Sequence, residues 1–153
     1  MNTLYLQTHI KAPIQACFDL SRSIDLHLES TVHTHEKAIA GKTSGLIGLN
    51  ETVTWQAKHF GIYWKMTVQI TAFEVPNYFR DEMVKGPFKT MRHEHFFEGQ
   101  SDGSILMKDV FTFASPMGIL GGMVDKLYLE GYMRKFLEKR NEVIKAKAEE
   151  NYS

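Results

Sequence analysis

The sequence has a single cysteine, only four prolines and no excess of charge of either sign. A lone Cys17 cannot form an internal disulfide, so disulfides do not stabilise this chain. Lysine and arginine number 18 and are matched by 18 acidic residues, which leaves no overall basic character for binding nucleic acid. No apolar run reaches the length of a membrane span, and the first residues lack the pattern of a signal peptide. We therefore expect a cytoplasmic protein with no nucleic-acid partner and no membrane span.

Bulky apolar side chains are what the sequence has in quantity. It contains 8 methionines, 10 phenylalanines, 6 tyrosines and 2 tryptophans. Methionine repacks readily and aromatic rings bury large areas, so this composition indicates a bulky, adaptable interior. At 153 residues, the chain is expected to form a single domain over residues 1–153 with a sizeable core.

Alternation of apolar and polar residues predicts seven strands. These strands are expected over residues 4–10, 32–40, 51–59, 62–74, 78–85, 88–98 and 104–114. Pro13 and Ser23 favour the starts of two short helices between the first two strands. The order of one strand, two short helices, six strands and a final long helix predicts an α+β domain. In this domain a seven-stranded antiparallel sheet receives the helix.

The final helix is expected over residues 115–148. Ser115 is a good N-cap, and Pro116 suits the first helical position, where its missing N–H is not needed. Apolar residues lie on one side of the helix before Gly131 and on nearly the opposite side after it. The sequence therefore predicts a change of buried face, or a bend, near Gly131.

The two parts of this helix are expected to differ in mobility. Residues 117–127 contain three glycines, each of which lowers helix stability by up to roughly 1 kcal/mol relative to alanine. We expect this part to be a movable cover for a cavity, with residues 129–144 as the anchored part. A rigid helix, whose glycines only allow close packing, is the alternative.

Methionines and polar groups share the inward side of the strands. Met66, Met83, Met91 and Met107 fall there on four strands consecutive in sequence, either as a surface for variable apolar shapes or as ordinary core. The polar residues of this side are His59, Asp81, His93, His95 and Asp109. Burial without partners would be costly, so these groups must pair with one another or with water. We therefore expect a partly polar cavity between sheet and helix.

The spacing of His93 and His95 places both imidazoles on one strand face. Asp81 or Asp109 could add an oxygen, which would suit zinc or iron or form an acid–base pair. A closed set of metal ligands is missing, so we expect a hydrogen-bonded cluster without metal or cofactor. We assign no catalytic residue, and these four residues are the candidates if the protein is an enzyme.

The residues expected to contact a ligand lie on the inward side of the strands and on the first part of the final helix. They are Trp55, His59, Trp64, Met66, Val68, Phe79, Asp81, Met83, Met91, His93, His95, Met107, Asp109, Phe111, Leu120, Val124 and Leu127.

Several motifs carry a likeness to a known superfamily. Ala12-Pro13 leads into Phe18-Asp19-Leu20, and the runs 40–46 and 79–88 add to the likeness, which covers almost the whole chain. The sequence resembles the SRPBCC superfamily of START-like, polyketide-cyclase-like and birch-pollen-allergen-like proteins, and within it the bacterial ligand-binding or cell-division-inhibitor-like branch. The resemblance implies a helix-grip fold, in which a curved sheet wraps around the C-terminal helix and encloses a cavity for hydrophobic molecules.

Three functions remain open. We favour a protein that binds a mostly hydrophobic small molecule or lipid, because an apolar cavity with a few polar groups is the usual form of a ligand pocket. The second is an enzyme of the cyclase or dehydratase kind that uses a His/Asp acid–base pair. The third is a partner-binding module, which would show a filled core and an exposed apolar patch.

Overall fold

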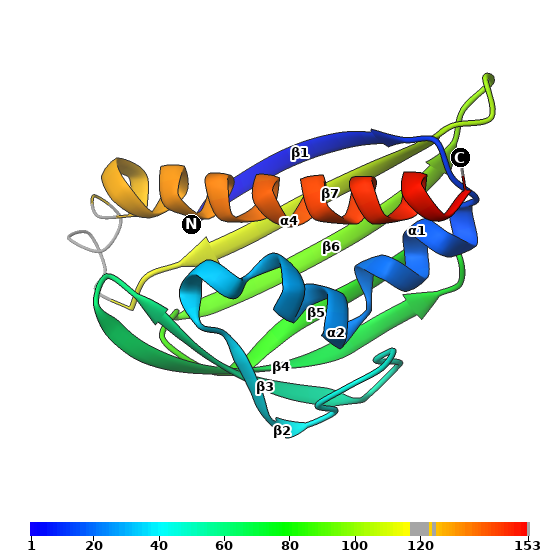
Figure 1. The fold of residues 1–153 in the computed structure, drawn as a ribbon. Coiled ribbons are helices and arrows are strands. Elements are labelled where there is room, and N and C mark those ends of the chain that lie inside the picture. Colours follow the sequence, from blue (N-terminus) through cyan, green and yellow to red (C-terminus); the bar gives the residue numbers. More distant parts are fainter. Residues whose placement is uncertain (117–122, 124, 153) are drawn as a thin grey trace.

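The computed structural model describes residues 1–116, 123 and 125–152 (Figure 1). The elements are β1 (Asn2–Ile10), α1 (Ile14–Ser21), α2 (Ile24–Ser30), the short helix η1 (Val32–Thr34), β2 (Lys37–Gly41), β3 (Thr52–His59), β4 (Ile62–Glu74), β5 (Tyr78–Lys85), β6 (Thr90–Gly99), β7 (Ile105–Ala114), the π-helical segment η2 (Asp125–Leu129) and α4 (Glu130–Tyr152). All neighbouring strands pair antiparallel, in the order β1-β7-β6-β5-β4-β3-β2. This architecture confirms the predicted α+β helix-grip fold.

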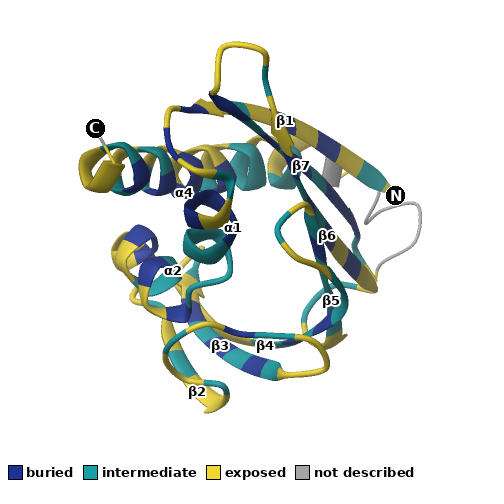
Figure 2. Cartoon of the chain, turned by 90° about the vertical axis from the view of Figure 1, so that its right-hand side faces the viewer, coloured by how far each residue is buried: buried dark blue, intermediate teal, exposed yellow. Residues whose placement is uncertain are grey.

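The sheet is strongly curved. In Figure 2 it bends from β1 at the top to β2 at the bottom, and α1, α2 and α4 lie across its concave side. The β3–β4 turn at Phe60 and Gly61, which the sequence predicted, has both residues at positive φ, 54° and 76°. Such a turn fits the right-handed twist of the paired strands. None of the described helices is both long and apolar enough to cross a membrane.

Both short helices begin where the sequence predicted. Pro13 precedes the first residue of α1, and the hydroxyl of Ser23 accepts a hydrogen bond from the Leu26 N–H at the start of α2. Phe18 of α1 makes edge contacts with the rings of Phe73, Phe79 and Phe97, at centroid distances of 5.3, 5.4 and 5.5 Å. This aromatic packing fixes α1 against the strands that carry the site.

Cys17 is fully buried beside Phe18. Burial raises the pKa of its thiol to about 11. The thiolate is the reactive form of cysteine, so this side chain is an inert part of the core.

The strand predicted over residues 32–40 is wrong in its first half. Val32–Thr34 form a turn of 3₁₀ helix, and His35 adopts a left-handed conformation with φ of 53°. The hydroxyl of Thr31 donates to the His27 carbonyl, and that of Thr34 donates to the Thr31 carbonyl. These side-chain bonds continue the helical path past α2, so extended backbone begins only at Lys37.

Strand β4 also departs from simple alternation. Its register with β5 shifts between Ile70 and Ala72, and such an irregularity re-aims the side chains that follow. Phe73, which follows the shift, packs on Phe18 of α1.

The start of the final helix lies mostly outside the described residues. Pro116 is in a turn, Met123 is helical, and α4 begins at Glu130 after the π-helical segment η2. A π-helical turn holds more residues than an α-helical turn and changes which side faces inward. The segment η2 lies just before Gly131, but the residues in front of it are outside the described residues except Met123, so the change of buried face stays a prediction. Most of the predicted cover, 117–127, lies outside the described residues, so its mobility stays a prediction.

Candidate functional site

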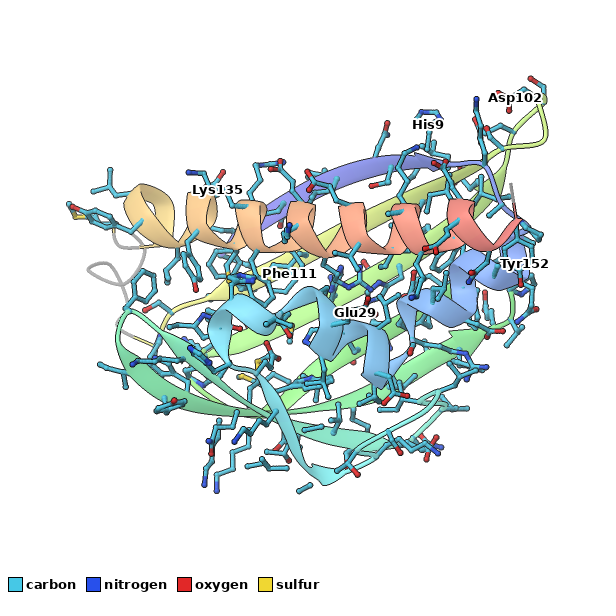
Figure 3. The ribbon with its side chains drawn as sticks, in the orientation of Figure 1. His9, Glu29, Asp102, Phe111, Lys135 and Tyr152 are labelled. Atoms are coloured by element: carbon cyan, nitrogen blue, oxygen red, sulfur yellow. The ribbon has the colours of Figure 1, made fainter. Side chains whose placement is uncertain are left out.

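A cavity of about 460 Å³ lies between the sheet and the helices. Its apolar lining comes from the inward side of β3 to β7 and from α4, where Met133, Phe136 and Leu137 face the strands. Figure 3 shows Phe111 of β7 in the space between sheet and helix. Among the lining residues Phe60 and Trp64, at the β3–β4 turn, are 63% and 40% exposed. The apolar lining therefore continues to the surface at this turn.

Most of the residues predicted to contact a ligand come together in this cavity. Those that line it are Trp55, His59, Trp64, Met66, Val68, Phe79, Asp81, Met91, His93, His95 and Phe111.

The remaining predicted residues lie elsewhere. Met83 and Met107 pack in the core without lining the cavity, and Asp109 is buried behind it. Leu127 is 67% exposed to solvent. Leu120 and the side chain of Val124 lie outside the described residues.

The four predicted polar residues form two Asp–His pairs on three adjacent strands. His93 Nε2 lies 2.7 Å from Asp109 Oδ1, and His95 Nε2 lies 2.7 Å from Asp81 Oδ2. The centroids of the two imidazole rings lie 3.8 Å apart, with the ring planes tilted by 33°. Strand register explains the grouping, because Asp81 is opposite His93 on β5 and β6 and His95 is opposite Asp109 on β6 and β7. The predicted hydrogen-bonded cluster therefore forms.

Two residues of α4 complete this cluster. Asn141 donates from Nδ2 to Asp109 Oδ2 at 2.7 Å, and Arg140 donates to Asn141 Oδ1 at 2.8 Å and to the Ser21 carbonyl at 3.1 Å. The Arg140 guanidinium also lies 3.6 Å from Asp109. We call Asp81, His93, His95, Asp109, Arg140 and Asn141 the Asp–His cluster.

The sequence prediction did not place Arg140 and Asn141 in the site. A signal for them was present, because both share a helical side with Leu137 and Ile144, at spacings of three and four residues. Polar residues within such an apolar stripe must find buried partners.

Burial and charge set the protonation of the cluster. Burial, together with repulsion from His95, lowers the pKa of His93 to about 4, so this imidazole is neutral near pH 7. Burial opposes ionisation of Asp109, but the hydrogen bond from His93, the neighbouring His95 and the charge of Arg140 hold its pKa well below the usual value. Burial also opposes ionisation of Asp81, but the hydrogen bond and charge of His95 outweigh it and lower the pKa of this carboxyl. Two carboxylates, Asp81 and Asp109, therefore share the site with the single guanidinium of Arg140 and with the neutral imidazole of His93.

This cluster has the groups for acid–base chemistry and for metal ligation. Asp81, His93 and His95 each offer one ligand atom, and these atoms lie within 4.8 Å of one another. Two imidazoles and a carboxylate suit zinc or iron. However, each Nε2 already bonds a carboxylate, and Arg140 places a positive charge beside the same groups. An ion would have to compete with these contacts.

A second polar group lies on the β2 and β3 side of the cavity. His27 Nε2 lies 2.9 Å from Glu36 Oε1, and the His27 ring contacts Trp55 at 4.1 Å between centroids, with the ring planes tilted by 34°. Nearby, His59 Nδ1 lies 2.5 Å from the hydroxyl of Tyr132 on α4. All five residues line the cavity. The sequence prediction missed His27, Glu36 and Tyr132, and it had no signal for Glu36, which it placed within a regular strand.

The comparisons with known proteins identify the fold. No protein-family model matches the chain, and no curated protein matches its sequence. Among solved structures, the protein TTHA0849 from Thermus thermophilus aligns with a TM-score of 0.74 at 16% identity, covering 96% of this chain and 99% of that one. A START superfamily protein from Mycobacterium smegmatis aligns with a TM-score of 0.71 at 12% identity and 97% coverage of both chains.

A plant protein has the same architecture. The ginseng major latex-like protein 151 from Panax ginseng aligns with a TM-score of 0.69 at 15% identity, covering 96% of this chain and 97% of that one. Sequence identities this low indicate a shared fold but not a shared activity. The chain therefore has the helix-grip fold of the START-like proteins, which confirms the likeness to the SRPBCC superfamily at the level of fold.

Proposed function

We propose that this protein binds a mostly apolar small molecule in the cavity between sheet and helices. The observation that carries this proposal is the cavity itself, about 460 Å³ in volume, with a mainly apolar lining and a few buried polar groups. This is the usual anatomy of a site for a small organic ligand. A partner-binding module would instead be expected to have a filled core.

The proposal treats residues 1–153 as one ligand-binding domain. The strands and helices around the cavity come from both halves of the sequence, since Ser21 to Ile24 contribute to it together with Met133, Phe136, Leu137 and Arg140. A shorter piece of the chain would leave the apolar lining without its cover.

Native mass spectrometry of freshly purified protein tests the proposal first, because a co-purifying ligand appears as added mass. Titration with Nile red, a neutral dye that fluoresces in apolar surroundings, tests it independently. We expect saturable binding at a ratio of one dye per chain. No added mass and no saturable dye binding would contradict the proposal.

A cavity-filling variant shows whether the dye binds inside. Ala57 is buried and lines the cavity, so Ala57→Phe should fill part of the volume and weaken dye binding. The matched control is Gln56→Phe, because Gln56 is the neighbouring residue and faces the other side of β3. Equal dye binding by the two variants would place the dye outside the cavity.

The Asp–His cluster favours acid–base catalysis as a second candidate function. His93 is neutral near pH 7, and His95 Nδ1 is buried without a hydrogen-bond partner among the described residues. This nitrogen lies 3.5 Å from Asp109 Oδ1, and an imidazole at the wall of a cavity can exchange a proton with a bound substrate.

A nitrobenzisoxazole probe tests this second candidate. A base removes its carbon-bound proton, the ring N–O bond breaks, and a coloured phenolate forms. We expect acceleration over buffer that is lost in His95→Gln and unchanged in His9→Gln, since His9 belongs to β1 outside the cavity. A rate equal to that of buffer would contradict catalysis by the cluster and leave binding intact.

A further inference from the structure

The carboxylate of Glu36 has an unused hydrogen-bond acceptor. Its side chain is only 6% exposed, and Oε1 is engaged by His27. Oε2 is buried and has no hydrogen-bond partner among the described residues. Glu36 lines the cavity. A buried carboxylate oxygen without a donor is costly, so a donor on a bound molecule would relieve that cost.

Aromatic rings surround this part of the cavity. The ring of His27 contacts that of Trp55, and His59 makes edge contacts with Tyr132 and Phe136 at centroid distances of 5.5 and 5.7 Å. All of these rings line the same cavity as Glu36. A carboxylate together with aromatic faces is the setting in which proteins bind ammonium groups, through an ion pair and cation–π attraction.

The charges of the cavity also favour a cation. Its described lining contains Glu36 and Asp81, and its two guanidiniums, Arg22 and Arg140, already engage protein partners. Arg22 lies 2.9 Å from Asp19 and donates to the Ile47 carbonyl. Among the described lining residues there is no lysine. A carboxylate on a ligand would meet no uncommitted cation there and would be repelled by Glu36.

Between the two polar groups the cavity wall is apolar. Glu36 is on the β2 and β3 side, and the Asp–His cluster lies over β5, β6 and β7, which are three to five strands from β2 in the sheet order. Met66 and Val68 of β4 line the wall between them. This arrangement suits a ligand whose polar end is separated from an apolar body.

We infer that the ligand carries a protonated amine, which donates to Oε2 of Glu36 and lies against the neighbouring aromatic rings. Its apolar body lies on the wall of Met66, Val68 and Phe111. This inference rests on the proposed function and names the class of ligand, an amine-bearing apolar molecule in place of an anion such as a fatty acid.

Three probes with one chain length test the inference. Dodecylamine, dodecanol and dodecanoate, each below its micellar concentration, are titrated near neutral pH against protein loaded with Nile red. We expect the amine to displace the dye at a concentration about tenfold lower than dodecanoate, as one charge-assisted contact would give. The concentration of dodecanol that displaces the dye should lie between those of the amine and dodecanoate.

Glu36→Gln removes the charge and keeps nearly the same shape. In this variant, the advantage of dodecylamine over dodecanol should disappear. Glu74→Gln is the matched control, because Glu74 is an exposed carboxylate at the end of β4 outside the cavity lining, and it should keep the wild-type order. If Glu36→Gln does not fold, Glu36→Asp is the second variant. It keeps the charge on a shorter side chain, so it should weaken the binding of dodecylamine and leave the binding of dodecanol unchanged.

The outcomes separate the inference from the proposed function. Dodecanoate binding as tightly as the amine, or an unchanged preference in a folded Glu36 variant, overturns the inference while dye binding still supports a ligand cavity. If neither the dye nor any of the three chains binds, the proposed function fails and the inference fails with it.

Discussion

The two polar groups of the cavity differ in how their buried carboxylates are compensated. In the Asp–His cluster, Asp109 accepts from His93 and Asn141 and lies beside Arg140, so its charge is well compensated. In the second group, Glu36 has one partner, His27, and a buried oxygen with none among the described residues. The difference teaches that burial alone does not mark a binding group. A carboxylate whose charge is compensated on every side, such as Asp109, stabilises the fold, whereas an unpartnered carboxylate oxygen at a cavity wall can receive a donor from a ligand.

Replacing Asp109 should cause the largest loss of stability among the variants of the two groups. Asp109→Asn removes the charge that faces Arg140 and leaves a buried guanidinium uncompensated, which costs about 3–5 kcal/mol when a buried pair loses one partner. Urea unfolding followed by circular dichroism measures the loss. A loss below about 1 kcal/mol would mean that the cluster is not the stabilising group we describe.

Acid should destabilise the protein through His93. Its pKa is about 4 in the folded protein and about 6.5 when unfolded, so the unfolded chain binds more protons between these values. Stability should therefore fall by about 2 kcal/mol between pH 7 and pH 5, while the lowered pKa values of Asp81 and Asp109 act only below about pH 4.

Unfolding in urea at several pH values checks this expectation. His93→Gln should be less stable near pH 7 but should lose most of the dependence on pH between 7 and 5. Glu36→Gln should keep the wild-type dependence, because it leaves the Asp–His cluster intact. Equal slopes in all three proteins would assign the acid sensitivity to another group.

Tyr132→Phe probes the contact that joins α4 to the second group. It removes the hydroxyl bonded to His59 Nδ1 and should cost about 0.5–1.5 kcal/mol, the usual value for one hydrogen bond. Tyr5→Phe, at a side chain 68% exposed on β1, is the control and should change stability very little. Similar losses in the two variants would show that the His59 contact contributes nothing.

Glu36→Gln should have the smallest effect on stability, within about 0.5 kcal/mol. Glutamine keeps an oxygen that can accept from His27, and Oε2 has no described partner to lose. Thermal unfolding compares the variant with wild type in the absence of added ligand. A large loss would mean that Glu36 serves the fold in the same way as Asp109.

Strand alternation was enough to predict one polar group and not the other. Asp81, His93, His95 and Asp109 belong to regular strands, where every second side chain points the same way, so the sequence placed all four on the inward side. Glu36 follows a 3₁₀ turn stabilised by threonine hydroxyls, where no such period applies. Its partner His27 comes from α2, and the contact depends on how that helix packs on β3.

The sequence by itself determined the order of elements, the starts of both short helices, most strand ends and the mixture of methionine, aromatic and polar residues on one side of the sheet. These follow from local periodicity and capping. Only the tertiary structure decided that a π-helical segment precedes α4, that Arg140 and Asn141 reach Asp109, and that Glu36 faces the cavity. Each depends on contacts between residues far apart in the chain, and the physical reason is that buried polar groups pair across elements whose mutual placement local patterns do not specify.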